Sequence, residues 1–330
     1  MLYPWLNEPY KQLQQLTVQE RLPHALLFVG PTGLGKQELA LTFSQFLHCH
    51  SPKGTLPCDT CDACTLFNAG SHPDHLLVAP EEAGKAILID QIRHVVEFSH
   101  HTAKQGGYRT IVVSPAERMN WNAQNALLKT LEEPGAKTLL ILVAEQINQL
   151  LPTVVSRCQQ RHIVAPSLTD GVAWLQEHAI DETEAKGLLL SARYAPLYAI
   201  SLREKPWFKE RRLLFSEIAA IQKNAIHLPK IAKKLSEYDG QEFLPALYQW
   251  VAQVIKAQQG ALTTRDEALV AGIDELAQQQ PQRLFAFQEA VLRALSLWLS
   301  GANPNKEILY EQLLMVLLGV PLTRDIVQAY

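Results

Sequence analysis

The sequence predicts an α/β fold of parallel strands built around a phosphate-binding loop, followed by an entirely helical second half. A glycine-rich segment at residues 30–37 follows the apolar run 25–29, which is typical of a buried strand, and precedes a run with helical spacing of apolar residues. The run at 138–144 is apolar throughout, as a strand buried on both faces of a parallel sheet is. From Pro206 onward, apolar residues recur at helical spacing.

Composition limits the classes of protein to which this chain can belong. Its 330 residues exceed the usual size of one domain, so we expect two or three. A formal net charge of −3 gives no overall basic signature of nucleic-acid binding. The sequence shows neither a basic leader with an apolar core nor an apolar run of membrane-spanning length, which predicts a cytoplasmic protein without membrane contact. Five cysteines in such a protein favour metal binding or inert thiols over disulfides.

The segment GPTGLGKQ predicts a phosphate-binding loop in which one position is changed. Gly30, Gly33 and Gly35 allow backbone N–H groups to converge on an anion, and Lys36 reaches the terminal phosphates. The next residue of a hydrolysing loop is Ser or Thr, whose hydroxyl holds Mg²⁺, whereas this chain has Gln37. A carboxamide is too long to replace that hydroxyl without moving the metal. A glycine turn without a ligand is the alternative, which the strand–loop–helix context disfavours.

Four closely spaced cysteines predict a structural zinc site formed by Cys49, Cys58, Cys61 and Cys64. Two Cys-x-x-Cys pairs share Cys61, and such short spacings allow thiolates to converge on a tetrahedral ion. Four sulfur ligands fill the zinc shell, so we expect a closed site. A redox dithiol and unrelated buried thiols are the alternatives. Histidines lie nearby in the sequence, but four thiolates need no histidine.

The strand predicted at residues 109–113 ends without the acidic pair that nucleotide hydrolysis requires. Hydrolases with this loop place a metal-holding Asp, usually followed by Glu, at the end of such a strand. This chain has Ser114 and Pro115 instead, and neither offers a carboxylate to Mg²⁺. Asp90 follows another predicted short strand, at 86–89, and is the alternative metal ligand. We also expect Asp90 to be the N-cap of a helix that extends to about residue 104.

The remaining segments of the first half supply further helices and strands. We expect helix near the N-terminus, with Trp5 as a core anchor, and a strand from about residue 75 to residue 79. The segment NALLKTLEEP predicts an amphipathic helix that ends at Pro134. The segment LPTVVSRC leads into a last strand, which ends near Val164.

The second half is predicted to be helical. Three short helices are expected first, at 172–178, 182–191 and 196–202. Longer amphipathic helices follow at 208–222, 243–257, 283–299 and 306–318. Most of their apolar residues should form a core, which is the usual role of such stripes.

The phosphate loop, the four-cysteine insertion and the segments NALLKTLEEP and LPTVVSRC together resemble a bacterial clamp-loader subunit of the AAA+ class. The resemblance extends over essentially the whole chain. It implies an AAA+ P-loop-like parallel-sheet domain at 1–165 with its zinc module at 49–64, a small helical lid domain at 166–205 and an all-α collar domain for oligomerisation at 206–330. The changed loop and the missing acidic pair resemble a family member that does not hydrolyse ATP.

The resemblance also assigns a role to Arg157. In this family the Arg of Ser-Arg-Cys projects into the ATP site of a neighbouring subunit, as an arginine finger acting in trans. A planar, permanently charged guanidinium suits γ-phosphate oxygens. By the same analogy Ser156 and Cys158 position or pack this segment. The alternative is that Arg157 pairs with a carboxylate of its own chain. ATP-using siblings also carry a nucleotide-sensing Arg where this chain has Pro196.

The implied function is that of a non-catalytic subunit of the DNA polymerase III holoenzyme, a DNA-directed DNA polymerase and nucleotidyltransferase complex of DNA replication. The implied partners are the gamma/tau ATPase subunits and the delta subunit and, through the complex, the sliding clamp and primed DNA. The implied cofactor is structural Zn²⁺, with ATP bound weakly or not at all by this chain.

Two alternatives stay open. The first is an active AAA+ ATPase, with Lys36 on the phosphates and Asp90 on Mg²⁺. The second is a zinc-containing nucleic-acid-binding protein. This second alternative has little support, because only Lys53 and Phe67 supply basic or aromatic character near the cysteines.

Overall fold

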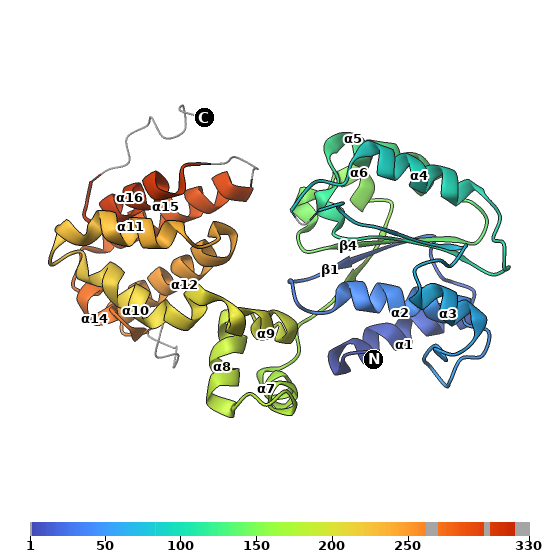
Figure 1. Ribbon diagram of the computed structural model, residues 1–330, viewed down its shortest axis with the longest axis horizontal. Helices are drawn as coiled ribbons and strands as arrows, with labels where there is room; N and C mark the ends of the chain where they lie inside the picture. The colour runs from blue at the N-terminus through green and yellow to red at the C-terminus, as the bar shows by residue number, and fades with distance from the viewer. Residues whose placement is uncertain (1, 83, 262–269, 300–303, 321–330) are drawn as a thin grey trace. The chain divides into compact units, whose positions relative to one another are not determined.

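The computed structural model describes residues 2–82, 84–261, 270–299 and 304–320. The chain divides into two compact units, Met1–Ala199 and Ile200–Tyr330, which are described separately. The first is an α/β unit and the second is helical, which confirms the predicted fold class (Figure 1).

A five-stranded parallel sheet in the order β2-β3-β4-β1-β5 forms the centre of the first unit. Strands β1 (Ala25–Val29), β3 (Arg109–Val113) and β4 (Thr138–Ala144) are buried along their whole length. The strands β2 (His75–Val78) and β5 (Gln159–His162) form the two edges. Continuous burial of the three inner strands explains why their sequences lack the alternation of a half-exposed strand.

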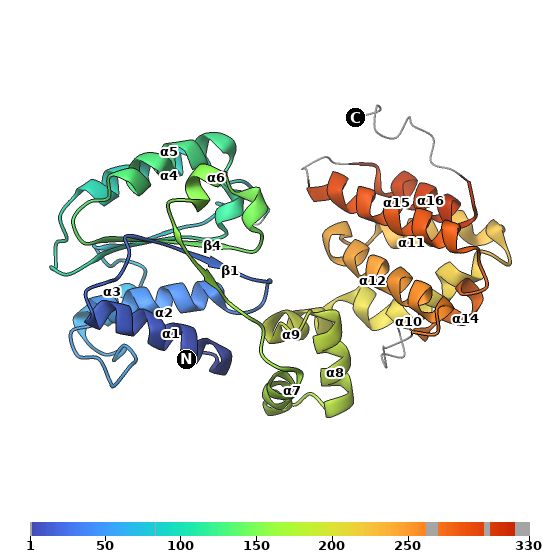
Figure 2. The ribbon, with the colours of Figure 1, turned by 180° about the vertical axis from the view of Figure 1, so that it is seen from behind.

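Helices cover both faces of this sheet, as Figures 1 and 2 show. One layer contains α1 (Asn7–Val18), α2 (Lys36–His48) and α3 (Asp62–Asn68), and the other contains α4 (Ile89–His100), α5 (Trp121–Glu132) and α6 (Pro152–Val155). Short 3-10 turns occur at Pro4–Leu6, Ala116–Arg118 and Ile147–Gln149. Successive residues of the inner strands enter opposite cores, so the sheet divides the apolar interior in two.

The prediction for residues 86–90 was wrong in two respects. Within the described chain, residues 86–89 form no strand, and Ile87 makes only an isolated bridge with Met119. The α4 helix begins at Ile89, so Asp90 lies in its first turn and pairs with Arg93 at 2.7 Å instead of acting as N-cap. The backbone N–H of Leu88 is bonded by the Gln91 side chain, a bond typical of a capping box. The helix also ends at His100, before the expected residue 104.

Three short helices follow the sheet, as expected. They are α7 (Leu168–Glu177), α8 (Glu182–Ser191) and α9 (Pro196–Glu204). Trp174 of α7 packs edge-on against Trp5, with ring centroids 5.2 Å apart, and also against Tyr3. These contacts tie α7 to the N-terminal segment of the same unit.

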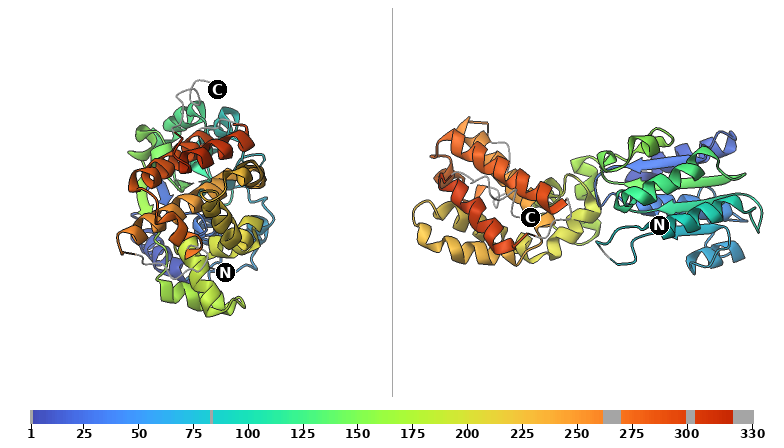
Figure 3. Two further views of the ribbon diagram at one scale, coloured as in Figure 1. Left: turned by 90° about the vertical axis from the view of Figure 1, so that its left-hand side faces the viewer. Right: turned by 90° about the horizontal axis from the view of Figure 1, so that it is seen from above.

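The second unit is a bundle of helices (Figure 3). Its elements are α10 (Pro206–Ala220), the 3-10 turn η4 (Ala225–His227), α11 (Leu228–Ser236), α12 (Gly240–Gln258), α14 (Ile273–Leu276), α15 (Pro281–Leu299) and α16 (Lys306–Leu317). The α12 helix packs along α15, and α16 packs on α11 and α15. Inside the bundle, Trp250 stacks on Phe215 at 4.8 Å and donates its indole N–H to the carbonyl of Ala271.

A buried ion pair joins the beginnings of β2 and β3. The side chains of Asp74 and Arg109 are 0 % and 2 % exposed, and their charged atoms are 3.3 Å apart. The backbone N–H groups of Lys104 and Gln105 each donate to the Asp74 carboxylate over 2.8 Å. Burial alone would raise the pKa of Asp74, but these hydrogen bonds and the guanidinium outweigh it and lower the pKa.

Replacing Asp74 by Ala should lower the free energy of unfolding by about 3–5 kcal/mol, because Arg109 would remain buried without its partner. Urea denaturation measures this change. Asp90→Ala removes an exposed ion pair and should cost less than about 1 kcal/mol.

The same pair predicts a pH dependence. Because the folded-state pKa of Asp74 is lowered, its stabilisation is present above the unfolded-state value and is lost as pH falls through the folded-state value. Asp74→Ala should therefore lose less stability on acidification than the wild type does. Equal losses in the two proteins would contradict a stabilising ionised Asp74.

Candidate functional site

The glycine-rich loop lies between β1 and α2, as predicted. Gly33 and Gly35 both have φ of +77°, a conformation that favours glycine. A Cβ added to Gly30 would lie 2.4 Å from the carbonyl oxygen of Ile163. The helix α2 begins directly after Gly35, which is its N-cap. The segment therefore has the backbone arrangement of a phosphate-binding loop.

The ammonium of Lys36 is engaged by the loop itself. The residue is 6 % exposed, and its Nζ donates to the carbonyls of Gly30 at 2.7 Å and Pro31 at 2.8 Å. Burial lowers the pKa of Lys36, and nearby carboxylates, Glu145 foremost, oppose that effect. A phosphate would have to draw the ammonium away from these two carbonyls.

Two other segments of the same unit hold this loop. The backbone N–H of Leu197, in α9, donates to the carbonyl of Gly33 at 3.2 Å. A Cβ on Gly33 would lie 2.3 Å from the backbone nitrogen of Tyr198. On the N-terminal side, the indole N–H of Trp5 donates to the carbonyl of Leu34 at 2.8 Å. Trp5 is half-buried and packs against the core cluster on this side of the sheet, as expected of a core anchor, and it also supports the loop.

Gln37 and Ser114, the two residues that the sequence analysis places at the metal-ligand positions of a hydrolysing loop, meet in the structure. The Ser114 hydroxyl donates to the Gln37 side-chain oxygen over 2.8 Å, although the two residues are 77 positions apart. Both groups are uncharged. Two neutral side chains bonded to each other supply none of the carboxylate oxygens that Mg²⁺ prefers.

Glu117 was missed by the sequence analysis. It lies in the turn after β3, two residues beyond Pro115, and its carboxylate accepts the backbone N–H of Glu145 at 3.0 Å. Burial raises the pKa of Glu117, and Lys36 and Glu145 are among the charges that act on it. An acidic residue shortly after the strand was the available signal. Asp90, by contrast, is not among the carboxylates that act on Lys36.

The four predicted zinc ligands come together. The sulfur atoms of Cys49, Cys58, Cys61 and Cys64 all lie within 4.8 Å of one another. Tetrahedral thiolates about 2.3 Å from a zinc ion are about 3.8 Å apart, so the cluster fits this ion. Burial raises the pKa of the fifth thiol, Cys158, to about 12, as befits an inert core residue.

The surrounding backbone also suits thiolate ligands. Cys49 follows α2, whereas Cys61 is the N-cap of α3, so the cluster joins the ends of two helices. The backbone N–H of Cys58 donates to the sulfur of Cys49, and that of Cys61 donates to the sulfur of Cys58, both at 3.3 Å. N–H groups of Thr60 and Cys61 lower the pKa of Cys58 to about 5, which favours the metal-binding thiolate.

Two of the nearby histidines, His48 and His75, are engaged elsewhere. His48 Nε2 and His75 Nδ1 each lie 2.8 Å from the hydroxyl oxygen of Thr110, in β3. Of the residues that the structure describes, only the four cysteines form a group that could hold a metal ion.

Arg157 lies between α6 and β5, and its side chain is 37 % exposed. Its guanidinium pairs with the Glu132 carboxylate at 2.6 Å and donates to the Thr153 carbonyl at 3.0 Å. In the chain without partners, Arg157 therefore pairs with a carboxylate of its own chain, as the alternative expected. An exposed pair contributes about 0–1 kcal/mol, so it leaves Arg157 available to a stronger acceptor. Cys158 is buried in the core beneath, whereas Ser156 is exposed.

The remaining expectations concern α9 and membrane contact. Pro196, which occupies the position expected for a nucleotide-sensing Arg, is the first residue of α9. In the described part of the chain, no helix combines the length and apolarity needed to span a bilayer.

Comparison with known proteins gives consistent matches. A family model described as DNA polymerase III, delta subunit, matches residues 5–167, and a second model, for the C-terminal region of that subunit, matches residues 205–318. The structure of a DNA polymerase III gamma subunit-related protein from Thermotoga maritima is 20 % identical, with a TM-score of 0.42 over 93 % of this chain and 99 % of that one. This structural likeness is too low to support an argument about function.

Curated relatives match over nearly the full length. The chain is 34 % identical to DNA polymerase III subunit delta' of Pseudomonas aeruginosa, over 97 % of this chain and 98 % of the relative. It is 30 % identical to DNA polymerase III subunit delta' of Escherichia coli, over 95 % of this chain and 94 % of that protein. The chain belongs to the family of DNA polymerase III delta' subunits.

Proposed function

We propose that this chain is a non-hydrolysing subunit of the DNA polymerase III clamp loader that lends Arg157 to the ATP site of a neighbouring subunit. Its partners would be the gamma/tau ATPase subunits and the delta subunit, with which it helps to load the sliding clamp onto primed DNA in the cytoplasm. The observation that carries the proposal is the hydrogen bond between Gln37 and Ser114. It replaces a metal-binding hydroxyl and carboxylate with a neutral pair.

Hydrolysis by this chain would need a metal ion between nucleotide phosphates and acidic side chains. In this chain Gln37 and Ser114 stand at the two sequence positions expected for the metal ligands and are bonded to each other, and Lys36 is bonded to backbone carbonyls. Glu117 is the carboxylate that an active site would have to recruit, but one of its oxygens already accepts the backbone N–H of Glu145 at 3.0 Å, and burial raises its pKa. Membership of the delta' family and this geometry together disfavour the alternative of an active ATPase.

To act as an arginine finger in the ATP site of a neighbouring subunit, Arg157 must be accessible and must be able to leave its carboxylate partner. Arg157 meets both requirements, because its side chain is 37 % exposed and its partner Glu132 is also exposed. A bidentate contact with γ-phosphate oxygens would be charge-assisted on both sides and stronger than the exposed pair.

We also propose that the four-cysteine cluster holds one structural Zn²⁺. The ion would fix the loop between α2 and α3 by linking Cys49 to the other three thiolates. The division into an AAA+ domain, a lid domain and an oligomerising collar domain, with boundaries after residues 165 and 205, is part of the same proposal. The alternative of a nucleic-acid-binding zinc module finds no specific support in the cluster.

Arg157→Ala should leave assembly of the reconstituted clamp loader unchanged and abolish rapid hydrolysis at the neighbouring ATP site, where such a finger contributes about 10³–10⁵ in rate. Rapid-quench experiments measure how much ATP each complex hydrolyses in one turnover. The amplitude of the fast phase should be smaller for the variant than for the wild type. Arg157→Lys should be nearly as slow, because an ammonium cannot reproduce the planar fork.

Glu132→Gln is the matched control for this experiment. It removes the partner of Arg157 within the chain while leaving the arginine in place, so the fast phase should keep its full amplitude. Equal defects in Arg157→Ala and Glu132→Gln would show that the ion pair, and not contact with ATP, is what the complex needs.

The isolated chain should show no ATP turnover above background, and Lys36→Ala should leave that rate unchanged. A coupled assay of phosphate release with and without Mg²⁺ measures both. Magnesium-dependent turnover that Lys36→Ala abolishes would establish the alternative of an active ATPase.

Purified protein should contain about one zinc ion per chain by elemental analysis. Cys61→Ser should release the metal faster to a chelator, because one of four thiolates is lost. Cys158→Ser alters a cysteine outside the cluster and should keep the full zinc content. Zinc-free native protein whose melting temperature is insensitive to chelators would refute the site.

A further inference from the structure

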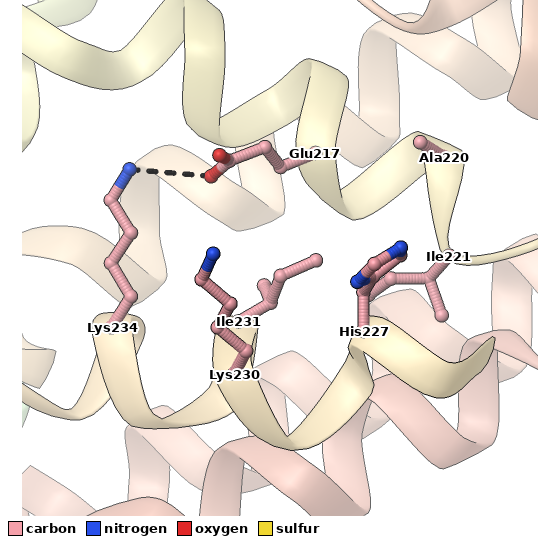
Figure 4. Close-up of a pocket in the computed structure, with 7 residues that line it drawn as sticks. All are labelled: Glu217, Ala220, Ile221, His227, Lys230, Ile231 and Lys234. Atoms are coloured by element: carbon pink, nitrogen blue, oxygen red, sulfur yellow. Dashed lines mark hydrogen bonds and ion pairs between the residues drawn. The ribbon is translucent and has the colours of Figure 1, made fainter. Parts of the chain in front are cut away.

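The helical unit contains a pocket of about 250 Å³ between the end of α10 and the segment η4–α11 (Figure 4). Apolar side chains of Ala220, Ile221 and Ile231 contribute to its lining. Sites for small ligands usually measure about 300–1,000 Å³, so this pocket suits one inserted side chain better than a cofactor. We call it the α10–α11 pocket.

The two lysines of this pocket differ in their partners. Lys234 lies 3.2 Å from Glu210 and 3.3 Å from Glu217, so its charge is compensated. Burial alone would lower the pKa of Lys234, but the two carboxylates outweigh burial and raise the pKa. Lys230, one helical turn earlier on the same face, has no carboxylate partner within the described ranges of the chain. In Figure 4 its ammonium points into the space between the two helices.

The segment η4–α11 beside the pocket is basic in sequence. Residues 222–236 contain four lysines and no acidic residue. Glu217 of α10 also lines the pocket, and Lys223 and Lys234 are paired with carboxylates, so Lys230 is the lining lysine without such a partner among the described residues. Close to His227, Ile226 is 78 % exposed and extends the apolar surface beyond the pocket. An uncompensated cation beside an apolar lining is complementary to an apolar side chain with a carboxylate next to it.

We infer that the α10–α11 pocket binds an acidic peptide segment of a partner protein, which inserts one apolar side chain and sets a carboxylate against Lys230. The inference goes beyond the proposed function, which assigns oligomerisation to residues 206–330 as a whole and gives no role to this pocket. A nucleic acid fits less well. Among the lining residues there is no Phe, Tyr or Trp for a base to stack on, His227 being the one aromatic ring, and Lys230 is the one lining lysine without a carboxylate partner in the described part of the chain.

Panning a random dodecapeptide phage library against the full-length chain tests this inference. Enriched peptides should carry an aromatic or aliphatic residue within two positions of Asp or Glu. Fluorescent synthetic copies should bind with a Kd that Lys230→Glu raises about tenfold, because an attraction becomes a repulsion. Ala220→Trp fills the pocket from an exposed position and should weaken binding at least as much.

Lys233→Glu is the matched control, since it reverses an exposed lysine of the same helix that does not line the pocket. It should change the Kd less than about twofold, and the melting temperatures of all three variants should match that of the wild type. Equal effects of Lys230→Glu and Lys233→Glu would overturn the inference, because they would indicate non-specific electrostatic attraction to the helix. Failure to enrich acidic peptides would also overturn it. So would binding of a single-stranded 20-nucleotide DNA that Ala220→Trp abolishes.

Discussion

Close packing of backbone around the glycine-rich loop is the constraint on which the first unit depends. A side chain at Gly30, Gly33 or Gly35 would collide with Ile163, Tyr198 or Tyr3, respectively. These three contacts come from the segment after β5, from α9 and from the N-terminus. The loop is therefore the point at which distant parts of the chain meet, and its glycines are required for this packing whether or not a nucleotide binds.

This packing role gives the loop a structural use that does not depend on hydrolysis. Burying an ammonium group destabilises a protein unless the group donates hydrogen bonds. The Lys36 ammonium donates to two carbonyls of its own loop. The lysine thus stabilises the loop from inside. Gln37 has no hydroxyl, but its carboxamide oxygen accepts a hydrogen bond from Ser114 that links α2 to the end of β3. Lys36 and Gln37, at positions that serve catalysis in a hydrolysing loop, here stabilise the loop and its contact with β3.

The sequence predicted what depends on local pattern and missed what depends on contacts between distant residues. The strands β1 and β4 were evident because burial on both faces leaves a continuous apolar run, and the close spacing of four cysteines nearly determines the geometry of their cluster. The apolar run at 86–89 gave a false strand, because only Ile87 pairs. No local pattern could reveal the Gln37–Ser114 bond or the α10–α11 pocket, which exist only after packing.

Two arginines show how burial decides what an ion pair can do. Arg109 is 2 % exposed, bonded to Asp74 and stacked on Phe98, so leaving its partner would strand a charge inside the protein. Arg157 pairs with Glu132 over a shorter distance, yet both side chains are exposed and water can replace either partner at little cost. The shorter ion pair is therefore the one whose loss costs less stability. Of the two, only Arg157 can exchange its carboxylate for an acceptor on another subunit without a large loss of stability.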